Sequence, residues 1–193
     1  MKFTKIPVNT FKELVINAGV LLEEFDPTAP AVADGKIIGA TSGGTQFRAT
    51  PSFLDFGDDI DNCPKNTKEL KRLENWEVIA SGNFVTVTAT SGTRLVGAAD
   101  LSGEKITPRR DLASTDFKDM WLIGDYSDKT GATKGGYVAI HMMNTLSTGG
   151  FQIQTADKEK GRFAFEFTAH FSMDAQDTVP FEIYVHAGED EPA

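Results

Sequence analysis

The sequence predicts a mainly β protein: a β-sandwich of two packed antiparallel sheets, with a flanking short α-helix and a long loop between strands. The strongest sign is a C-terminal stretch in which apolar residues alternate with polar or small ones, namely Phe163, Phe165, Phe167, Ala169 and Phe171. Side chains of a strand point to opposite faces in turn, so this stretch has one apolar face. Residues 181–186 alternate in the same way, and 18 glycines indicate many turns.

The other elements follow in chain order. Strands are expected at residues 14–16 with 19–22, at 36–40 and 45–49 (a pair, or one strand interrupted by Ser42-Gly43-Gly44), at 76–88 with a bulge at Gly82, and at 117–124, 137–143, 151–155, 162–171 and 181–186. The helix is expected at 91–99, with Ser91 as its N-cap and with Leu95 and Val96 packed on the sandwich.

Residues 50–75 lose the strand period and predict the long loop. In this loop, apolar residues alternate irregularly with acidic ones. The apolar residues are Phe53, Phe56 and Ile60, and the acidic ones are Asp55, Asp58, Asp59 and Asp61. Asn66, followed by Glu69, has the pattern of a cap for a short helix within the loop. Loops this long are usually functional or disordered, and a monomer seldom presents clustered apolar groups on one. We therefore expect this loop to make contacts with another molecule.

Length, charge and cysteine content limit the function. The chain of 193 residues fits one domain, residues 1–193, with an acidic tail at 189–193. A net charge of −9 argues against a free-standing nucleic-acid binder, which needs basic patches. The single cysteine, Cys63, excludes an internal disulfide framework. Since the sequence has neither a signal-peptide pattern nor a long apolar stretch, we expect a soluble protein made in the cytoplasm, without a membrane segment.

The short motifs for catalysis or metal binding are incomplete. Asp55-Phe56-Gly57 matches a kinase triplet without the other kinase motifs, and Asp128 stands where a P-loop needs glycine. Asp59 and Asp61 have calcium-like spacing, but Cys63 breaks the pattern. We therefore expect no enzyme, no cofactor and no metal.

The C-terminal strands place four polar residues together if they pair as a hairpin. With Phe171 facing Phe181, His170 lies opposite Glu182, and Glu166 lies opposite His186. Such a face is either a metal or acid–base site, or a pair of cross-strand ion pairs. Because the four residues are spread along a flat sheet, ion pairs are the favoured interpretation.

Several segments together carry a family resemblance. They are residues 38–44 (Ile-Gly-Ala-Thr-Ser-Gly-Gly), 55–70, 97–100, 105–109, 147–155 and the hairpin at 160–185. In their order and spacing, from about residue 15 to residue 188, they resemble the major tail tube protein of long-tailed bacteriophages, in particular those that infect Gram-positive hosts.

This resemblance implies the tail tube fold, in which six copies form a ring and the inner sheets join into one barrel of about 24 strands. Rings stack into the tube of the virion tail, and the loop at 50–75 reaches the neighbouring ring. The implied partners are other copies of the chain, the tape measure protein, and tail terminator or baseplate proteins. Genomic DNA passes through the bore at ejection without specific binding.

The dimensions of such a barrel suit a DNA duplex. Strands about 4.8 Å apart and tilted by about 40° leave a bore of roughly 35–40 Å. An acidic bore repels phosphate groups, although salt screens this repulsion beyond about 10 Å. The candidates for the bore or for an outer polar face are Glu77, Glu166, His170, Glu182 and His186.

Two other functions stay open. One is the inner tube of a contractile tail or of a secretion-type injection machine, whose subunits share the same fold. The other is a β-sandwich carbohydrate-binding module, which needs an exposed aromatic platform. Trp76, Trp121 and three tyrosines give that alternative little support.

Overall fold

The computed structural model describes residues 5–8, 10, 13–126 and 135–188. The described part is mainly β, as predicted, with one short α-helix. Its elements are β1 (Ile16–Leu22), η2 (Asp34–Lys36), β2 (Thr41–Asp55), β3 (Lys71–Phe84), α1 (Ala89–Val96), β4 (Ala99–Ser102), β5 (Lys105–Pro108), η3 (Ser114–Asp116), β6 (Lys118–Asp125), β7 (Tyr137–Ser147), β8 (Phe163–Thr168) and β9 (Phe181–His186). Within this part of the chain, no helix is long and apolar enough to cross a membrane.

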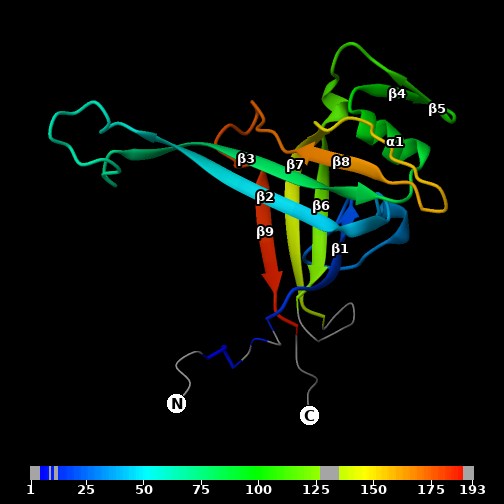
Figure 1. Ribbon diagram of the computed structural model, residues 1–193, viewed down its shortest axis with the longest axis horizontal. Helices are drawn as coiled ribbons and strands as arrows, with labels where there is room; N and C mark the ends of the chain where they lie inside the picture. The colour runs from blue at the N-terminus through cyan, green and yellow to red at the C-terminus, as the bar shows by residue number, and fades with distance from the viewer. Residues whose placement is uncertain (1–4, 9, 11–12, 127–134, 189–193) are drawn as a thin grey trace.

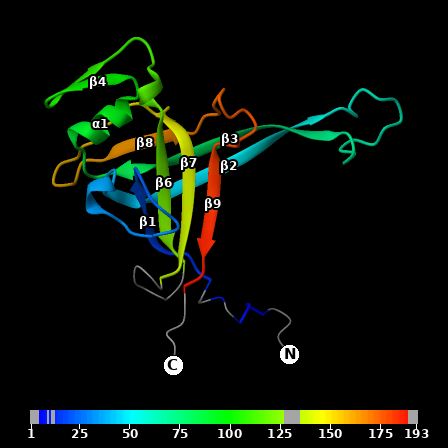
Figure 2. The ribbon, with the colours of Figure 1, turned by 180° about the vertical axis from the view of Figure 1, so that it is seen from behind.

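Seven strands form one antiparallel sheet in the order β1-β6-β7-β8-β3-β2, with β9 paired to β7. β7 joins its two halves. The first part of β7 pairs with β6 and β9, whereas its last residues, Leu146 and Ser147, pair with β8. The half β1-β6-β7-β9 crosses the half β7-β8-β3-β2 (Figures 1 and 2). The two sheets expected from the sequence are therefore connected through one shared strand, and β4 and β5 form a separate two-stranded sheet.

The main core lies between these two halves and receives side chains from both. Phe163, Phe165, Phe167 and Ala169 are buried, which confirms the alternation predicted for β8. Phe171 differs, because it follows the end of the strand and is 42% exposed. The other core residues come from β1, β3, β6, β7 and α1 and the segment before β2: Leu21, Ile38, Val78, Ala80, Phe84, Leu95, Met120, Leu122 and Met142.

The C-terminal hairpin expected from the sequence is wrong. β8 pairs with β3 and with the end of β7, and β9 pairs with β7 over the whole range from Phe181 to His186. In β9, Phe181 packs against the core, but Ile183 and Val185 are exposed. Alternation within a strand defines its two faces, yet it does not specify which other strand is its partner.

The helix expected at 91–99 forms, but it begins and ends earlier, at Ala89–Val96. Thr88, not Ser91, is the N-cap of α1: its hydroxyl accepts a hydrogen bond from the Ser91 N–H at 3.1 Å, and the Ser91 hydroxyl accepts one from the Thr88 N–H at 2.9 Å. This reciprocal pair is a capping box. Gly97 ends the helix with φ 86, a left-handed backbone angle that glycine adopts at low cost.

A buried arginine attaches the helix to the sheet. Arg94 Nη2 donates to the carbonyl of Asp119 at 2.8 Å and to the hydroxyl of Thr145 at 3.2 Å, so that α1 is bound to β6 and β7. Burial lowers the pKa of Arg94, and the carboxylate of Glu23, 3.6 Å from Nη1, opposes that shift. The guanidinium group lies over the ring of Phe167.

Leu95 is buried, as predicted, whereas Val96 is only half-buried. Leu95→Ala is expected to lower the free energy of unfolding by about 2–5 kcal/mol, because it leaves a cavity between helix and sheet. Leu101→Ala is a matched control, since Leu101 is 42% exposed and its truncation opens no cavity. Urea unfolding of both variants measures the difference, and equal stabilities would show that α1 contributes little to the core.

Three other expectations are corrected. The segment at 151–155 contains only an isolated bridge, Gln154 with Arg162, and not a strand. The strand expected at 36–40 does not form, since Lys36 ends the 3-10 helix η2 and β2 begins only at Thr41. The bulge expected at Gly82 lies instead in the partner strand β2, where Gly43 and Gly44 have positive φ angles and the register with β3 shifts. The two-stranded sheet β4–β5 was not predicted, since its four-residue strands are too short to show a period.

Candidate interaction surface

The hairpin of β2 and β3 extends beyond the rest of the sheet along the longest axis of the molecule (Figure 1). β8 pairs with β3 only between Ile79 and Phe84, so the outer parts of β2 and β3 pair only with each other. Residues 50–55 and 71–75 therefore belong to strands, and the expected loop at 50–75 is corrected to a connection at 56–70. The outer hairpin faces solvent on both sides, which explains why its sequence has no alternating pattern.

The tip loop, residues 56–70, is organised by its own hydrogen bonds. The carboxylate of Asp55 accepts one from the Gly57 N–H through Oδ1 and one from the Asn66 N–H through Oδ2, each at 3.0 Å. Gly57 is buried against Leu70 and Cys63. The short helix considered after Asn66 does not form, because Asn66 has φ 60 and the chain continues in turns. The tip loop is thus a compact unit closed by one carboxylate.

Removing this carboxylate is expected to loosen the tip loop without unfolding the body. Asp55→Ala deletes two charge-assisted hydrogen bonds, each worth about 1.5–3 kcal/mol. The amides of Gly57 and Asn66 should then exchange with solvent one to two orders of magnitude faster. Asp58→Ala is the matched control, because Asp58 is exposed and has no hydrogen-bond partner in the described structure. Unchanged exchange in Asp55→Ala would contradict the role given to this carboxylate.

The hairpin end exposes apolar side chains next to acidic ones. The exposed fractions are 50% for Phe53, 57% for Phe56 and 51% for Ile60, and Leu54 and Leu73 on the strands are exposed as well. The acidic residues Asp58, Asp59 and Asp61 are exposed, and the described structure gives their carboxylates no ion pair. The hydrogen bonds of the tip loop hold its backbone in one compact shape, so these side chains extend from defined backbone positions.

The outward face of β2, β3 and β8 is polar and brings together two of the predicted residues, Glu77 and Glu166. The strand register puts both on the face opposite the core. Glu77 forms an exposed ion pair with Arg48 at 3.0 Å, and Glu166 accepts a hydrogen bond from the Thr148 hydroxyl at 3.0 Å. A shallow hollow of about 200 Å³ lies on this polar face, lined by Gln46, Arg48, Ile79, Ser81 and Glu166.

The other three predicted residues lie elsewhere. His170 follows β8, where its ring meets Phe117 edge-on and its Nδ1 is 3.1 Å from the Asn144 carbonyl. Glu182 and His186 are on β9, and His186 stacks on Tyr137 with ring centroids 5.2 Å apart. The expected pairs His170–Glu182 and Glu166–His186 do not form, because β8 and β9 are not neighbours.

A histidine–carboxylate cluster exists instead around His141, which the sequence reasoning missed. His141 stacks on Trp121 at 4.2 Å, and its Nε2 lies 3.1 Å from Asp119 Oδ2. Across β7 and β9 its Nδ1 lies 3.9 Å from Glu182 Oε2, which also accepts a hydrogen bond from Tyr184. That hydrogen bond raises the pKa of Tyr184. The registers of β7 with β6 and of β7 with β9 place these groups together, so no local pattern could identify the cluster.

The described residues contain no group of three or more His, Cys, Asp or Glu arranged to hold a metal ion. The chain was also compared with known proteins: no family model matches it, and no curated protein matches it. The functional interpretation therefore depends on the geometry of the hairpin and of the polar face, together with the sequence motifs.

Proposed function

We propose that this chain is the subunit of a phage tail tube, in which rings of six copies stack into a conduit for DNA. The observation that carries the proposal is the projecting β2–β3 hairpin. An isolated two-stranded hairpin is marginally stable in water, and exposed apolar clusters favour aggregation. An ordered tip loop that exposes Phe56 and Ile60 far from the core is therefore best explained as a contact with the next ring.

The polar face of β2, β3 and β8 is the part that suits the wall of the bore. With the end of β7, this half of the sheet has four strands, and six such units supply the roughly 24 strands of the proposed barrel. β2 pairs only with β3 in the described chain, so its outer edge is available to a neighbouring copy. Ring closure would remove this edge, which is otherwise a liability for aggregation.

In this role DNA passes through without specific binding, and the chain needs no catalytic group, cofactor or metal. The tape measure protein would occupy the bore during assembly, and tail terminator or baseplate proteins would bind the tube ends. The subunit would be made in the cytoplasm of the host and would act in the virion. The same ring would serve a contractile tail or an injection machine, and micrographs of straight or contracted tails distinguish these uses.

A carbohydrate-binding module is the less favoured alternative. Its binding platform would need exposed aromatic rings, but Trp121 is 7% exposed and Trp76 packs edge-on against Phe181, with ring centroids 5.4 Å apart. Both tryptophans thus contribute to the interior of the protein and not to an open platform.

The mass of the purified protein tests the proposal. Sedimentation equilibrium over a range of concentration and salt should show species of six times the 21.0 kDa chain mass, and longer polymers built from them. A chain that stays monomeric under all conditions, with and without a tail-tip scaffold as initiator, would contradict the proposed function.

A further inference from the structure

We propose that the tip loop binds a defined receiving loop, residues 149–162, at the opposite end of the next copy. This inference rests on the proposed tube function, and it assigns the partner of the hairpin within the chain itself. The receiving loop connects the end of β7 to β8 and exposes two apolar side chains, Phe151 at 44% and Ile153 at 57%. They match the two apolar side chains that the tip loop presents, Phe56 and Ile60.

The positions of the two loops favour a head-to-tail contact. The tip loop lies at one end of the longest axis, and the residues just before β8 lie at the other end (Figures 1 and 2). A contact between two different patches at opposite ends leaves both ends of the pair open, so it repeats into a linear stack. A symmetric tip-to-tip dimer would instead bring two acidic surfaces together, which is unfavourable.

The two loops carry opposite net charge. The tip loop contains four acidic and two basic residues, and the receiving loop contains three basic and two acidic ones. Within the described structure, neither the carboxylates of Asp58, Asp59 and Asp61 nor the cationic groups of Lys158, Lys160 and Arg162 have an ion-pair partner. Groups that are free in the subunit are available to pair across an interface, where charge complementarity controls register and partner choice.

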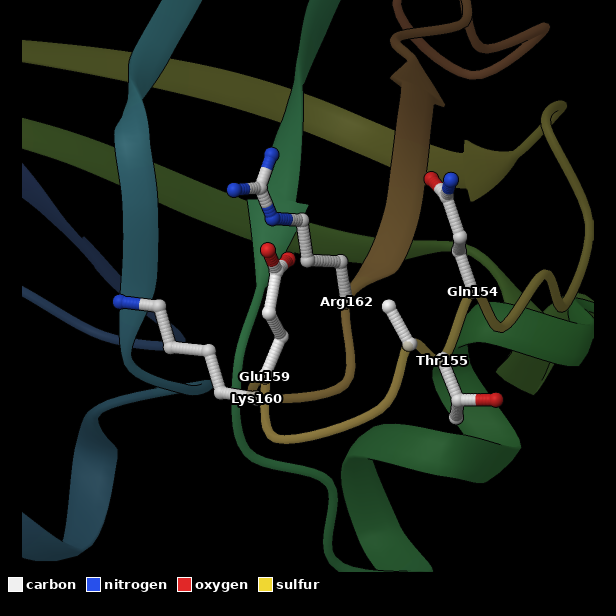
Figure 3. A pocket seen from close by; sticks show the side chains of 6 residues that line it. Gln154, Thr155, Glu159, Lys160 and Arg162 are labelled. Atoms are coloured by element: carbon white, nitrogen blue, oxygen red, sulfur yellow. The ribbon is translucent and has the colours of Figure 1, made fainter.

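The receiving loop also contains a hollow for a side chain. Figure 3 shows Gln154 and Thr155 on one side of it and Glu159, Lys160 and Arg162 on the other. Its volume of about 120 Å³ is close to the roughly 150 Å³ that accommodates one benzene ring. Its lining is mostly polar and charged, so an aromatic ring such as that of Phe56 would be held there chiefly by a cation–π contact with a guanidinium or ammonium group within about 6 Å of its face.

Charge reversal tests the pairing in the full-length chain. One variant carries Asp58→Lys, Asp59→Lys and Asp61→Lys; a second carries Lys158→Glu, Lys160→Glu and Arg162→Glu; a third carries all six substitutions and keeps the wild-type net charge. A control with Glu104→Lys, Asp174→Lys and Asp177→Lys changes the net charge as much as the first variant does. Sedimentation and electron microscopy report rings and tubes, and circular dichroism reports folding.

Each triple reversal should lower the amount of sedimented tube by about tenfold or more, because like charges then face each other across the contact. The variant with all six substitutions should recover wild-type assembly, and the control should assemble normally. Three results would each overturn the inference. The receiving-loop reversal could assemble like wild type, the variant with all six substitutions could fold and yet not assemble, or the control could lose assembly as strongly as the reversals. If one of these results appears while the wild-type protein still forms rings and tubes, only the loop pairing is wrong and the proposed function stands. If the wild-type protein itself forms neither rings nor tubes, the proposed function is contradicted.

Discussion

Replacing Phe53 and Phe56 with serine is expected to weaken tube formation strongly and to leave the subunit folded. Both side chains are at least half exposed, so their removal costs the isolated subunit little burial. In a stacked tube they become buried anchors, and the loss of such an anchor typically costs 2 kcal/mol or more. The concentration needed for assembly should therefore rise by at least about 30-fold, as measured by sedimentation of the polymer.

A matched control separates a specific effect from a general loss of surface hydrophobicity. Leu112→Ser with Phe171→Ser removes two apolar side chains that are 57% and 42% exposed and lie outside the hairpin. This variant should assemble at the wild-type concentration. If the Phe53/Phe56 variant assembled equally well, with unchanged circular dichroism, the hairpin end would not be the stacking element.

Phe167→Ala is expected to cause the largest loss of subunit stability, about 3–5 kcal/mol. Phe167 is fully buried, and its ring centroid is 5.7 Å from that of Phe165 and 5.6 Å from the guanidinium carbon of Arg94. A domain is usually stable by only 5–15 kcal/mol, so the variant should lose much of its margin. The urea midpoint should fall accordingly.

Phe171→Ala provides the comparison within the same run of phenylalanines. Phe171 has the same parity as Phe167 but follows the end of β8 and is 42% exposed, so its truncation should cost well under 1 kcal/mol. Similar midpoints for the two variants would mean that the core does not lie on the alternating face of β8.

The sequence predicted those features that depend on local pattern. The burial of Phe163, Phe165 and Phe167 followed from alternation, and the helix near Leu95 followed from a serine close to its start. The partners of β8 and β9 could not be predicted, because pairing depends on strands far apart in the chain. The outer hairpin was read as a loop because strands that are exposed on both faces need no alternation.

For the candidate site, too, the sequence predicted the local features but not the contacts between distant strands. Phe53, Phe56 and the carboxylates near them were found from the loss of strand period over residues 50–75, although they lie on a hairpin and its tip loop instead of one long loop. Glu77 and Glu166 share a face because each lies opposite the buried parity of its strand. Glu182 meets His141 and not His170, a contact that required the register of β7 with β9.

The most direct measurement is electron cryo-microscopy of the assembled full-length chain. The tube proposal predicts a six-fold cross-section with a bore of roughly 35–40 Å, lined by the polar face that carries Glu77 and Glu166, and a β2–β3 hairpin that extends from each ring to the next. The tube proposal would be contradicted by discrete monomers in every condition or by a cross-section without six-fold symmetry. Rings in which the hairpin makes no contact with a neighbouring ring would contradict it as well.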